Sequence, residues 1–377
     1  MLKKCFYFWL LICCCTQLNA QQYGLFNTRT LFDGFENPAQ KTFVLDHSRQ
    51  YASNFFVPNL TINANTEGND RLFRLLSRAG LSTTKDTLGQ NKYLNTLLQS
   101  PNVYVFSYKI FKSYKYHKEL GFSWQLRTDV AFDYDKESLD ILDTYATNPG
   151  YKNRLLESSF NSADQIQAYH QFSITYRENY NKKLAFGAKL SFLTGILYNS
   201  LNLNKTDFFY DDNADVINMN LAGSYRTSFV EGSKLTMRSF LPGFKNPGLA
   251  ISLGTSYTAK NGVFIMANIK DFGFIRWKET SLQQVDELIP ITSASTREVP
   301  AIESNIAANV ANPKDDNRSY YSPTTARADF LISKPYGSYT PTLIVSKNLL
   351  SNGGDLTLVN KYRLNNFSAS LVPSYNM

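Results

Sequence analysis

Cysteine is almost absent from this chain. All four cysteines lie in the first fifteen positions of a 377-residue sequence, at Cys5, Cys13, Cys14 and Cys15. Long apolar runs are absent as well, because nothing after the amino terminus approaches the ~20 residues that a transmembrane helix requires. These absences exclude a disulfide framework and a bundle of transmembrane helices. A chain of this kind must be held together by a core or a closed sheet, and it could cross a membrane only with strands.

Histidine is scarce too, and nothing in the sequence has the pattern of a catalytic or metal site. His47, His117 and His170 have no closely spaced metal ligand or nucleophile beside them. The segment 211–215 (DDNAD) places oxygens at its first, third and fifth positions, but it lacks the glycine and the later glutamate of a calcium loop. We therefore interpret 211–215 as a solvated turn and predict a chain without enzymatic activity, metal ion or cofactor.

The first twenty residues have the layout of a secretory signal peptide. Two lysines precede an apolar run from Phe6 to Cys15, and a short polar stretch then ends at the small residue Ala20. A retained membrane anchor is the alternative, but the run is much shorter than a membrane span. We predict cleavage before Gln21. The predicted organisation is a signal peptide at 1–20, an amino-terminal segment at 21–54 and a β-domain at 55–377.

The segment Leu120–Asp135 shows the period of two that is typical of a β-strand. Its even positions, from Leu120 to Tyr134, are mostly apolar, and its odd positions, from Gly121 to Asp135, are mostly polar or small. In a soluble sandwich, the apolar face would meet a second sheet. In an outer-membrane barrel, it would meet lipid and the polar face would line a lumen. This segment alone leaves both interpretations open.

The same alternation recurs along most of the chain, together with a high aromatic content of 24 Tyr and 27 Phe. We predict thirteen strands, at 55–65, 103–114, 119–134, 167–178, 183–194, 197–209, 216–229, 248–259, 262–277, 326–334, 338–347, 355–363 and 366–374.

The connections between these strands favour a membrane barrel. If the first strand runs outward, the clearly long connections fall on one rim, and the other rim has short turns, among them 209–215; the long ones are 66–102, 136–166, 230–247 and 278–325. Outer-membrane barrels have this asymmetry and an even number of strands. We therefore predict an all-β fold, a transmembrane antiparallel barrel of about fourteen strands with a closing strand beyond Met377. Short helices are predicted in its outer loops, at 70–79 and 137–145.

Charged side chains would line the lumen of such a barrel. Arg127, Asp129 and Asp133 lie on the odd face of one strand, and Arg177 and Lys189 lie on the corresponding faces of two later strands. We predict that the charges of the first strand pair with Arg177 or Lys189 across the lumen. The alternative is that these residues line a path for a solute.

Three motifs resemble those of known outer-membrane barrels. Asn37-Pro38-Ala39 resembles the amino-terminal NPA motif of barrels related to the long-chain fatty-acid transporter FadL, which include the PorV-like and PorQ-like proteins of Bacteroidetes. The strand with Gly248, Gly254 and Tyr257 looks like a recurring strand of these same barrels. The strand with Asp271, Gly273 and Trp277 looks like one of an uncharacterised Bacteroidetes outer-membrane barrel family. The resemblance implies a barrel of about fourteen strands that contains the folded amino-terminal segment. It does not imply fatty-acid transport.

The NPA stretch has two interpretations from its residues alone. Pro38 disfavours a helical conformation at Asn37, and asparagine can hydrogen-bond to its own backbone in a turn. The stretch could therefore plug the lumen, or it could be an ordinary turn that leads to the first strand.

These observations predict an integral outer-membrane protein of a Gram-negative cell envelope. We expect it to transport a small or hydrophobic solute or to act as an accessory of envelope protein export. Its net charge of +8 fits attraction to anionic lipids, and no Lys/Arg stripe suggests nucleic acid. Membrane lipids and envelope or secretion-system proteins are thus the expected partners. An outer-membrane enzyme and a secreted carbohydrate-binding sandwich are the alternatives from other classes.

Overall fold

The computed structural model describes the larger part of the chain. The described residues are 31–41, 50–67, 94–112, 118–135, 138, 141, 148–228, 240–292, 318–350, 353–364, 367–371 and 373–376. The predicted signal peptide at 1–20, the predicted helix at 70–79, His47 and His117 lie outside them. In the predicted helix at 137–145, only Ser138 and Ile141 are described, and both are helical.

The fold is all-β, as the sequence predicts. One short helix, α2 (Asp33–Glu36), precedes the strands. Within the described residues, sixteen strands form one sheet with antiparallel pairing. They are β1 (Tyr51–Ser53), β2 (Asn59–Glu67), β3 (Leu94–Lys112), β4 (Lys118–Asp135), β5 (Leu155–Leu156), β6 (Ser162–Asn179), β7 (Leu184–Asp211), β8 (Val216–Thr227), β9 (Asn246–Thr258), β10 (Phe264–Thr292), β11 (Arg318–Pro323), β12 (Arg327–Ser333), β13 (Tyr339–Asn348), β14 (Gly354–Leu364), β15 (Phe367–Leu371) and β16 (Ser374–Asn376).

The strands follow one another around the sheet, with several broken into two pieces. β1 and β2 both pair with β3, and the order then runs through β4, β6 and β7. β8 and β9 lie end to end between β7 and β10. β11 and β12 share the other side of β10, and β13 and β14 follow. β15 and β16 both pair with β14.

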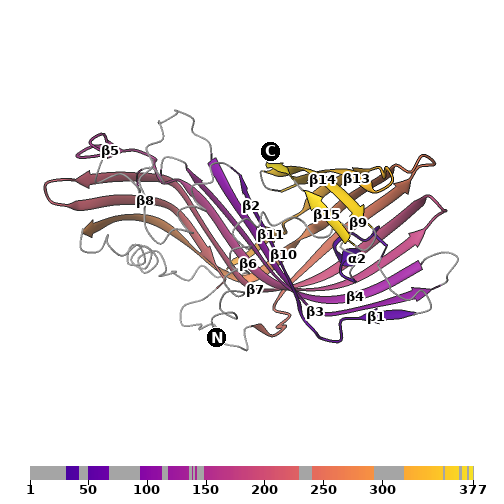
Figure 1. Cartoon of the computed structure of the whole chain (residues 1–377). Helices are drawn as coiled ribbons and strands as arrows, with labels where there is room; N and C mark the ends of the chain where they lie inside the picture. The colour runs from indigo at the N-terminus through magenta and orange to yellow at the C-terminus, as the bar shows by residue number, and fades with distance from the viewer. Residues whose placement is uncertain are drawn as a thin grey trace, which may run out of the picture.

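The sheet has two differently shaped halves. In Figure 1, its right half curls around α2. Its left half extends into a lobe, which we define as β5, β8 and the carboxyl-terminal halves of β7 and β10 that pair with them. β7 and β10, with 28 and 29 residues, run through both halves. Within the described residues, no pairing joins β1 or β2 to β15 or β16, so the sheet is strongly curved but open. A closed barrel remains a prediction.

The prediction of two strands at 183–194 and 197–209 is wrong, because both belong to the single strand β7. A bulge explains the error. The register between β6 and β7 shifts between Ala168 and Tyr169, opposite Gly195 and Leu197. An extra residue in a strand interrupts the side-chain alternation without ending the strand, and in the sequence this interruption resembles a turn.

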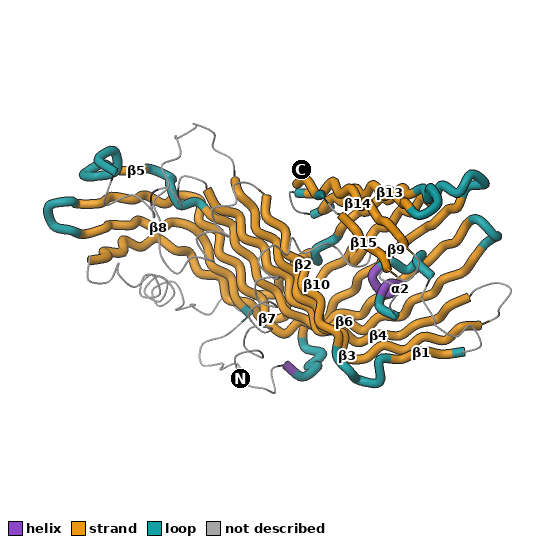
Figure 2. Tube along the Cα trace, in the orientation of Figure 1, coloured by secondary structure: helices purple, strands orange, loops and turns teal. Residues whose placement is uncertain are grey.

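This error also misplaced the turn at 209–215. Since β7 continues past Gly195, the turn between β7 and β8 lies at the far end of the lobe, opposite the short turns that follow β6, β9 and β12. Figure 2 shows these turns in teal at the two ends of the molecule. The predicted loops at 278–325 and 66–102 are also too long, because β10 extends to Thr292, β11 begins at Arg318 and β3 begins at Leu94.

The predicted alternation of Leu120–Asp135 is present in β4. Odd positions from Glu119 to Asp129 are buried, and the even positions Leu120 and Phe122 are exposed. The odd face is the concave one, because it faces α2: a Cβ on Gly121 would stand 3.0 Å from the Phe35 ring. The concave side of the sheet is therefore polar and buried, and its convex side is apolar and exposed.

Candidate functional site

The amino-terminal segment Asp33–Gln40 is buried against the concave face of the sheet. Phe35 and Ala39 are fully buried, and Asn37 is 1% exposed. The Asn37 Oδ1 atom accepts a hydrogen bond from the Ala39 backbone N–H at 3.0 Å, which is the local turn that asparagine favours. The Asn37 amide nitrogen lies 2.9 Å from the Met266 sulfur. We call Asp33–Gln40 the plug.

Glycines on neighbouring strands make room for the plug. A Cβ on Gly187 of β7 would stand 2.0 Å from the Pro38 carbonyl oxygen. A Cβ on Gly254 of β9 would stand 2.7 Å from Asn37 Oδ1. Gly254 belongs to a motif that the sequence analysis singled out, but Gly187 has no local signal, because its requirement arises from contact with a distant segment.

Charged side chains hold the plug in place. The Arg177 Nε–H donates to the Ala39 carbonyl at 2.9 Å. The Glu36 carboxylate forms an ion pair with Lys270 and accepts a hydrogen bond from the Tyr104 hydroxyl. Burial alone would raise the pKa of Glu36, but the ammonium groups of Lys270 and Lys189 lower it to about 2.

Asp271 is the centre of a buried polar cluster that lies next to the plug on the concave side of the sheet. Its carboxylate forms ion pairs with Arg127 and, at 2.8 Å, with Lys189. Gln171 and Ser252 donate to the same carboxylate at 3.1 and 3.3 Å. Asp271 has a φ of 51° at a register shift in β10, a left-handed conformation that aspartate tolerates better than most residues. The bulge thereby turns the carboxylate toward the concave side.

The predicted pairing with Arg177 or Lys189 is wrong for Arg127 and Asp129. Arg127 and Lys189 lie close together, but Asp271 bridges them, and the sequence analysis had treated Asp271 only as part of a motif. Asp129 lies 3.6 Å from Arg127 on its own strand and accepts a hydrogen bond from Tyr169 at 2.7 Å. Arg177 pairs with Glu119 at 3.7 Å. Asp133 is half-buried near the carboxyl-terminal end of β4.

An aromatic layer lies beside the Asp271 cluster. Trp277 is fully buried, and its Nε1–H donates to the Ser322 hydroxyl at 2.8 Å. Its ring packs against Tyr198, with the ring centres 5.4 Å apart, and comes so close to Gly195 that a Cβ there would stand 2.5 Å from it. Tyr169 belongs to the same buried cluster. Side chains therefore fill the concave side at this level.

The remaining motif residues are Gly248, Gly273 and Tyr257, and none of them contacts the plug in the described structure. A Cβ on Gly248 would stand 2.4 Å from the Phe274 carbonyl oxygen, and one on Gly273 would stand 2.1 Å from the Leu249 carbonyl oxygen. Both glycines thus permit close approach of β9 and β10. Tyr257 is 40% exposed on the convex face, away from the plug.

The convex face carries a continuous band of exposed apolar side chains. We call it the apolar belt: Leu120, Phe122, Ile174, Tyr176, Phe186, Leu190, Phe192, Leu249, Ile251, Leu253, Tyr257, Ile269, Phe272, Phe274, Phe330, Ile332, Leu343, Leu356 and Leu358. Each of these side chains is at least 37% exposed. Monomeric soluble proteins rarely expose apolar patches of this extent, so the belt is a candidate contact surface.

One edge of the belt is an aromatic row set by strand register. Phe106, Trp124, Phe172 and Phe192 are successive cross-strand partners on β3, β4, β6 and β7. Leu249 of β9 and Phe274 of β10 continue the row. Two segments outside the long strands add to it, since Phe56 packs on Phe106 and Phe244 stacks on Phe172 and Phe192. His170 lies beneath this edge, where its Nδ1 accepts from Trp124 at 3.2 Å.

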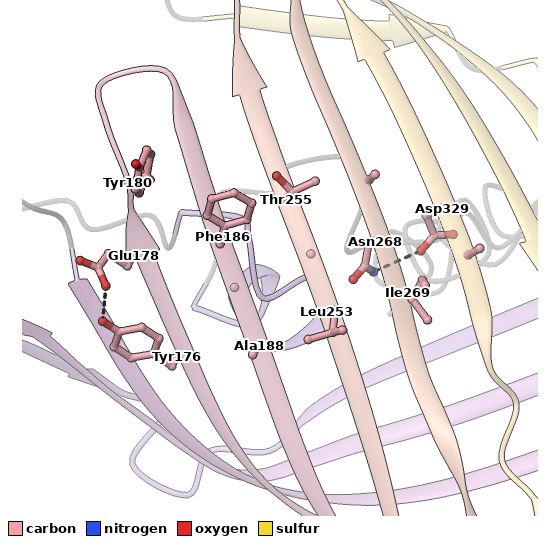
Figure 3. A pocket seen from close by; sticks show the side chains of 14 residues that line it. Tyr176, Glu178, Tyr180, Phe186, Ala188, Leu253, Thr255, Asn268, Ile269 and Asp329 are labelled. Carbon is pink, nitrogen blue, oxygen red and sulfur yellow. Dashed lines mark hydrogen bonds between the residues drawn. The ribbon is translucent and has the colours of Figure 1, made fainter.

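A hollow of about 740 Å³ lies within the belt. Figure 3 shows Phe186, Ala188 and Leu253 on adjacent strands around it, with Tyr176 and Tyr180 at one side. Tyr176 donates to Glu178 at 2.5 Å, and Asn268 donates to Asp329 at 3.4 Å. The hollow exists because small side chains such as Ala188 and Ala267 line its floor.

A comparison with protein families assigns most of the chain to one family. Residues 46–376 match the model of a family of unknown function, DUF5723. The chain belongs to the DUF5723 family. No curated protein and no solved structure matches it, so the resemblance to FadL-like and PorV-like barrels has no support from a named relative.

This member of the DUF5723 family shows no metal cluster among its described residues: no group of three or more His, Cys, Asp or Glu side chains there could hold an ion. No helix in the described part of the chain is long and apolar enough to cross a membrane.

Proposed function

We propose that this member of the DUF5723 family is a membrane-embedded β-barrel of the outer membrane whose polar interior is closed by its own amino-terminal plug. The observation that carries the proposal is the distribution of side chains on the two faces of the sheet, which is the reverse of that in a soluble protein. Buried charges lie on the concave side, and the apolar belt lies on the convex side. A transmembrane barrel has this arrangement, because its outer surface contacts hydrocarbon and its inner surface contacts polar groups. A sandwich has its apolar residues between two sheets instead.

The dimensions of the belt support this proposal. From Leu249, in the aromatic row, to Tyr257, near the short turns, β9 advances ~26 Å at about 3.3 Å per residue. With the usual tilt of ~40°, this corresponds to about 20 Å across the bilayer, close to the ~25 Å apolar band of such barrels. The aromatic row would then lie at one membrane interface, where aromatic side chains are enriched.

The interior of the proposed barrel is filled by side chains, and this restricts how a solute could pass through it. The plug, the Asp271 cluster and the aromatic layer around Trp277 occupy the concave side in succession, so a solute could pass only if the plug moved and the side chains of the other two layers rearranged with it. We propose transport of a small solute that is gated by plug movement. Enzymatic activity is not part of this proposal.

The lobe favours a second candidate function, an accessory role in envelope protein export. The outer halves of β7, β8 and β10 continue beyond the aromatic row, and the lobe has a core of its own that includes Phe208, Ile217 and Met219. A folded lobe outside the belt would offer a surface for another envelope protein.

Fractionation tests the proposal. Membranes from cells that express the full chain are washed with sodium carbonate at high pH, and the pellet is run on a gel with and without boiling. A barrel stays in the pellet and migrates faster before boiling than after it. Release into the wash, together with a mobility that boiling does not change, would refute membrane insertion.

A further inference from the structure

Two turns at the aromatic row hold bulky residues in an unusual backbone conformation. Phe55, Phe56 and Phe244 have φ angles of 48°, 62° and 53°, which lie in the left-handed region. That region suits glycine, asparagine and aspartate, and it costs free energy for a bulky side chain. We call the segments 54–57 and 240–245 the first and second aromatic turns. Such strain persists only where the surrounding structure enforces it, and it is found mostly at functional sites.

Hydrogen bonds enforce the first aromatic turn. The Asn54 side chain donates to the Val57 carbonyl at 2.9 Å and accepts from the Ser107 backbone N–H at 2.8 Å. The Val57 N–H donates to the Asn54 carbonyl at 2.9 Å. The Phe55 N–H donates to the Ser53 hydroxyl at 3.0 Å. Asn54 thereby closes the turn on itself and ties it to β3.

Two buried side chains of the sheet enforce the second aromatic turn. The Thr194 hydroxyl accepts a hydrogen bond from the Phe244 N–H at 3.2 Å. His170 accepts from Trp124 through its Nδ1 atom, so its Nε2–H donates to the Phe240 carbonyl at 2.8 Å. The turn is therefore fixed to the sheet near both of its ends.

Both aromatic turns expose apolar side chains at the level of the aromatic row. Phe55 and Val57 are 74% and 70% exposed, and Leu241 and Phe244 are 63% and 59% exposed. The first turn packs on β3 and the second on β6 and β7, so the two stand about 10–15 Å apart along the row. In water, both the strain and the exposed apolar surface would be unfavourable. A contact that buries these side chains would offset both.

The chemistry of the aromatic turns fits lipid better than a protein partner. The side chains that they expose are mainly phenyl and alkyl groups, whereas protein interfaces depend mostly on Trp, Tyr and Arg. Asn54, His170 and Thr194 satisfy backbone groups of the turns, and a segment needs such partners where water is scarce. Irregular backbone is not tolerated in the middle of a bilayer, and both turns lie at the edge of the apolar belt.

We propose that the two aromatic turns form an interfacial anchor, which inserts Phe55, Val57, Leu241 and Phe244 among acyl chains next to the lipid headgroups. This inference rests on the proposed function, because it takes the apolar belt to face lipid, and it adds what sets the depth of the belt. A shift toward the midplane would bury irregular backbone in hydrocarbon. A shift outward would return the phenyl groups to water. The anchor therefore fixes the position of the belt along the membrane normal.

Fluorescence quenching measures the depth of each turn. A chain that lacks residues 1–20 carries Phe55→Cys, Leu241→Cys, Leu253→Cys or Leu155→Cys, is labelled with bimane and is assembled into phosphatidylcholine vesicles. The vesicles contain a lipid with a nitroxide either near the headgroup or near the end of an acyl chain. At positions 55 and 241, we expect the shallow nitroxide to quench about twofold more than the deep one or better. We expect the reverse order at position 253, midway along the belt on β9, and little quenching at position 155 of the lobe.

The outcomes separate the anchor from the membrane proposal. Quenching at position 253 without quenching at 55 and 241 would overturn the anchor and leave the embedded belt intact. Stronger quenching by the deep nitroxide at 55 and 241 would also overturn the anchor. Quenching at 55 and 241 with none at 253 would support the anchor and refute an embedded barrel. No quenching at any of the three positions would refute both.

Removal of the exposed side chains distinguishes an anchor from a purely structural turn. Glycine adopts a positive φ freely, so Phe55→Gly relieves the backbone strain while it deletes the phenyl group. Combined with Leu241→Ser, it should leave the unfolding midpoint in micelles unchanged or raise it, but lower the folded yield in vesicles about tenfold. Leu155→Ser in the lobe is the matched control and should assemble normally. A lowered midpoint, or a yield equal to that of the control, would overturn the anchor.

Discussion

Gly187 of β7 lies directly against Pro38 of the plug, so that a Cβ at Gly187 would stand 2.0 Å from the Pro38 carbonyl oxygen. These two residues are far apart in sequence, and their contact brings the backbone of the plug against the backbone of the sheet. It ties a glycine in a regular strand to the position of the amino-terminal segment.

Replacing Gly187 by valine should therefore displace the plug. The new side chain overlaps backbone atoms that cannot turn away, and overpacking of this kind costs about 1–3 kcal/mol. Hydrogen exchange of the peptide 32–41 measures the effect, and we expect much faster exchange in Gly187→Val than in the wild type. Ala188→Val is the control on the same strand, because Ala188 faces the convex side. Equal exchange in the two variants would contradict the contact.

The plug should also respond to acid through Glu36. Its pKa in the folded protein is about 2, below the ordinary value of 4.5, so ionised Glu36 stabilises the docked plug. The full contribution is present above pH 4.5 and is lost as the pH falls from 4.5 toward 2. A spin label at Lys41→Cys should become more mobile across this range. In a chain that also carries Glu36→Gln, the label should be mobile from the start and lack this acid step; an unchanged step would assign it to another group.

The Asp271 cluster should be costly to break and partly repairable. Asp271→Asn leaves the buried Arg127 and Lys189 without their shared carboxylate, which costs about 3–5 kcal/mol for a buried charge that loses its partner. Asparagine tolerates the left-handed φ at this position, so the backbone need not change. Denaturant unfolding measures the loss. We expect Lys189→Met in the Asp271→Asn background to restore part of the stability, and purely additive losses would contradict the bridge.

A charge within the apolar belt separates a membrane barrel from a soluble sheet. Leu253 is 49% exposed, so Leu253→Lys should be nearly neutral in water, but in a bilayer it should cost about 2–4 kcal/mol near the midplane. The measurement is the folded fraction after assembly into lipid vesicles. Leu155→Lys, at a 54% exposed position of the lobe, is the matched control and should assemble normally. Equal yields of the two variants would count against the lipid contact.

The sequence was sufficient to predict the strand type and the two faces of the sheet. In β4, the alternation from Leu120 onward specifies which side chains are buried, because the period of a strand is strictly two. The same rule failed around Gly195, where Ile196 has no partner opposite Ala168 and Tyr169 of the neighbouring strand and the register shifts. A bulge depends on the paired strand, and the local sequence does not contain that information.

In the candidate site, too, the sequence indicated some of the residues but not the contacts that they make. The motif residues Asn37 and Asp271 were recognisable as unusual, the first from its proline neighbour and the second from a family resemblance. Their roles arise from contacts between distant segments: Asn37 lies on Gly254, and Asp271 joins Arg127 to Lys189. Gly187 carries no local signal, because its role arises only from its contact with the plug.

Membrane insertion is tested most directly by the water accessibility of two leucines with similar exposure in the structure. Leu190 of the apolar belt is 59% exposed and Leu155 of the lobe is 54% exposed. All cysteines of the sequence lie in its first fifteen positions, so a chain that lacks residues 1–20 accepts single cysteines as probes. The chain with Leu190→Cys or Leu155→Cys is reconstituted into vesicles and treated with a charged, water-soluble maleimide. Rapid labelling at position 155 with protection at position 190 is the expected result; rapid labelling at both would contradict a membrane-embedded belt.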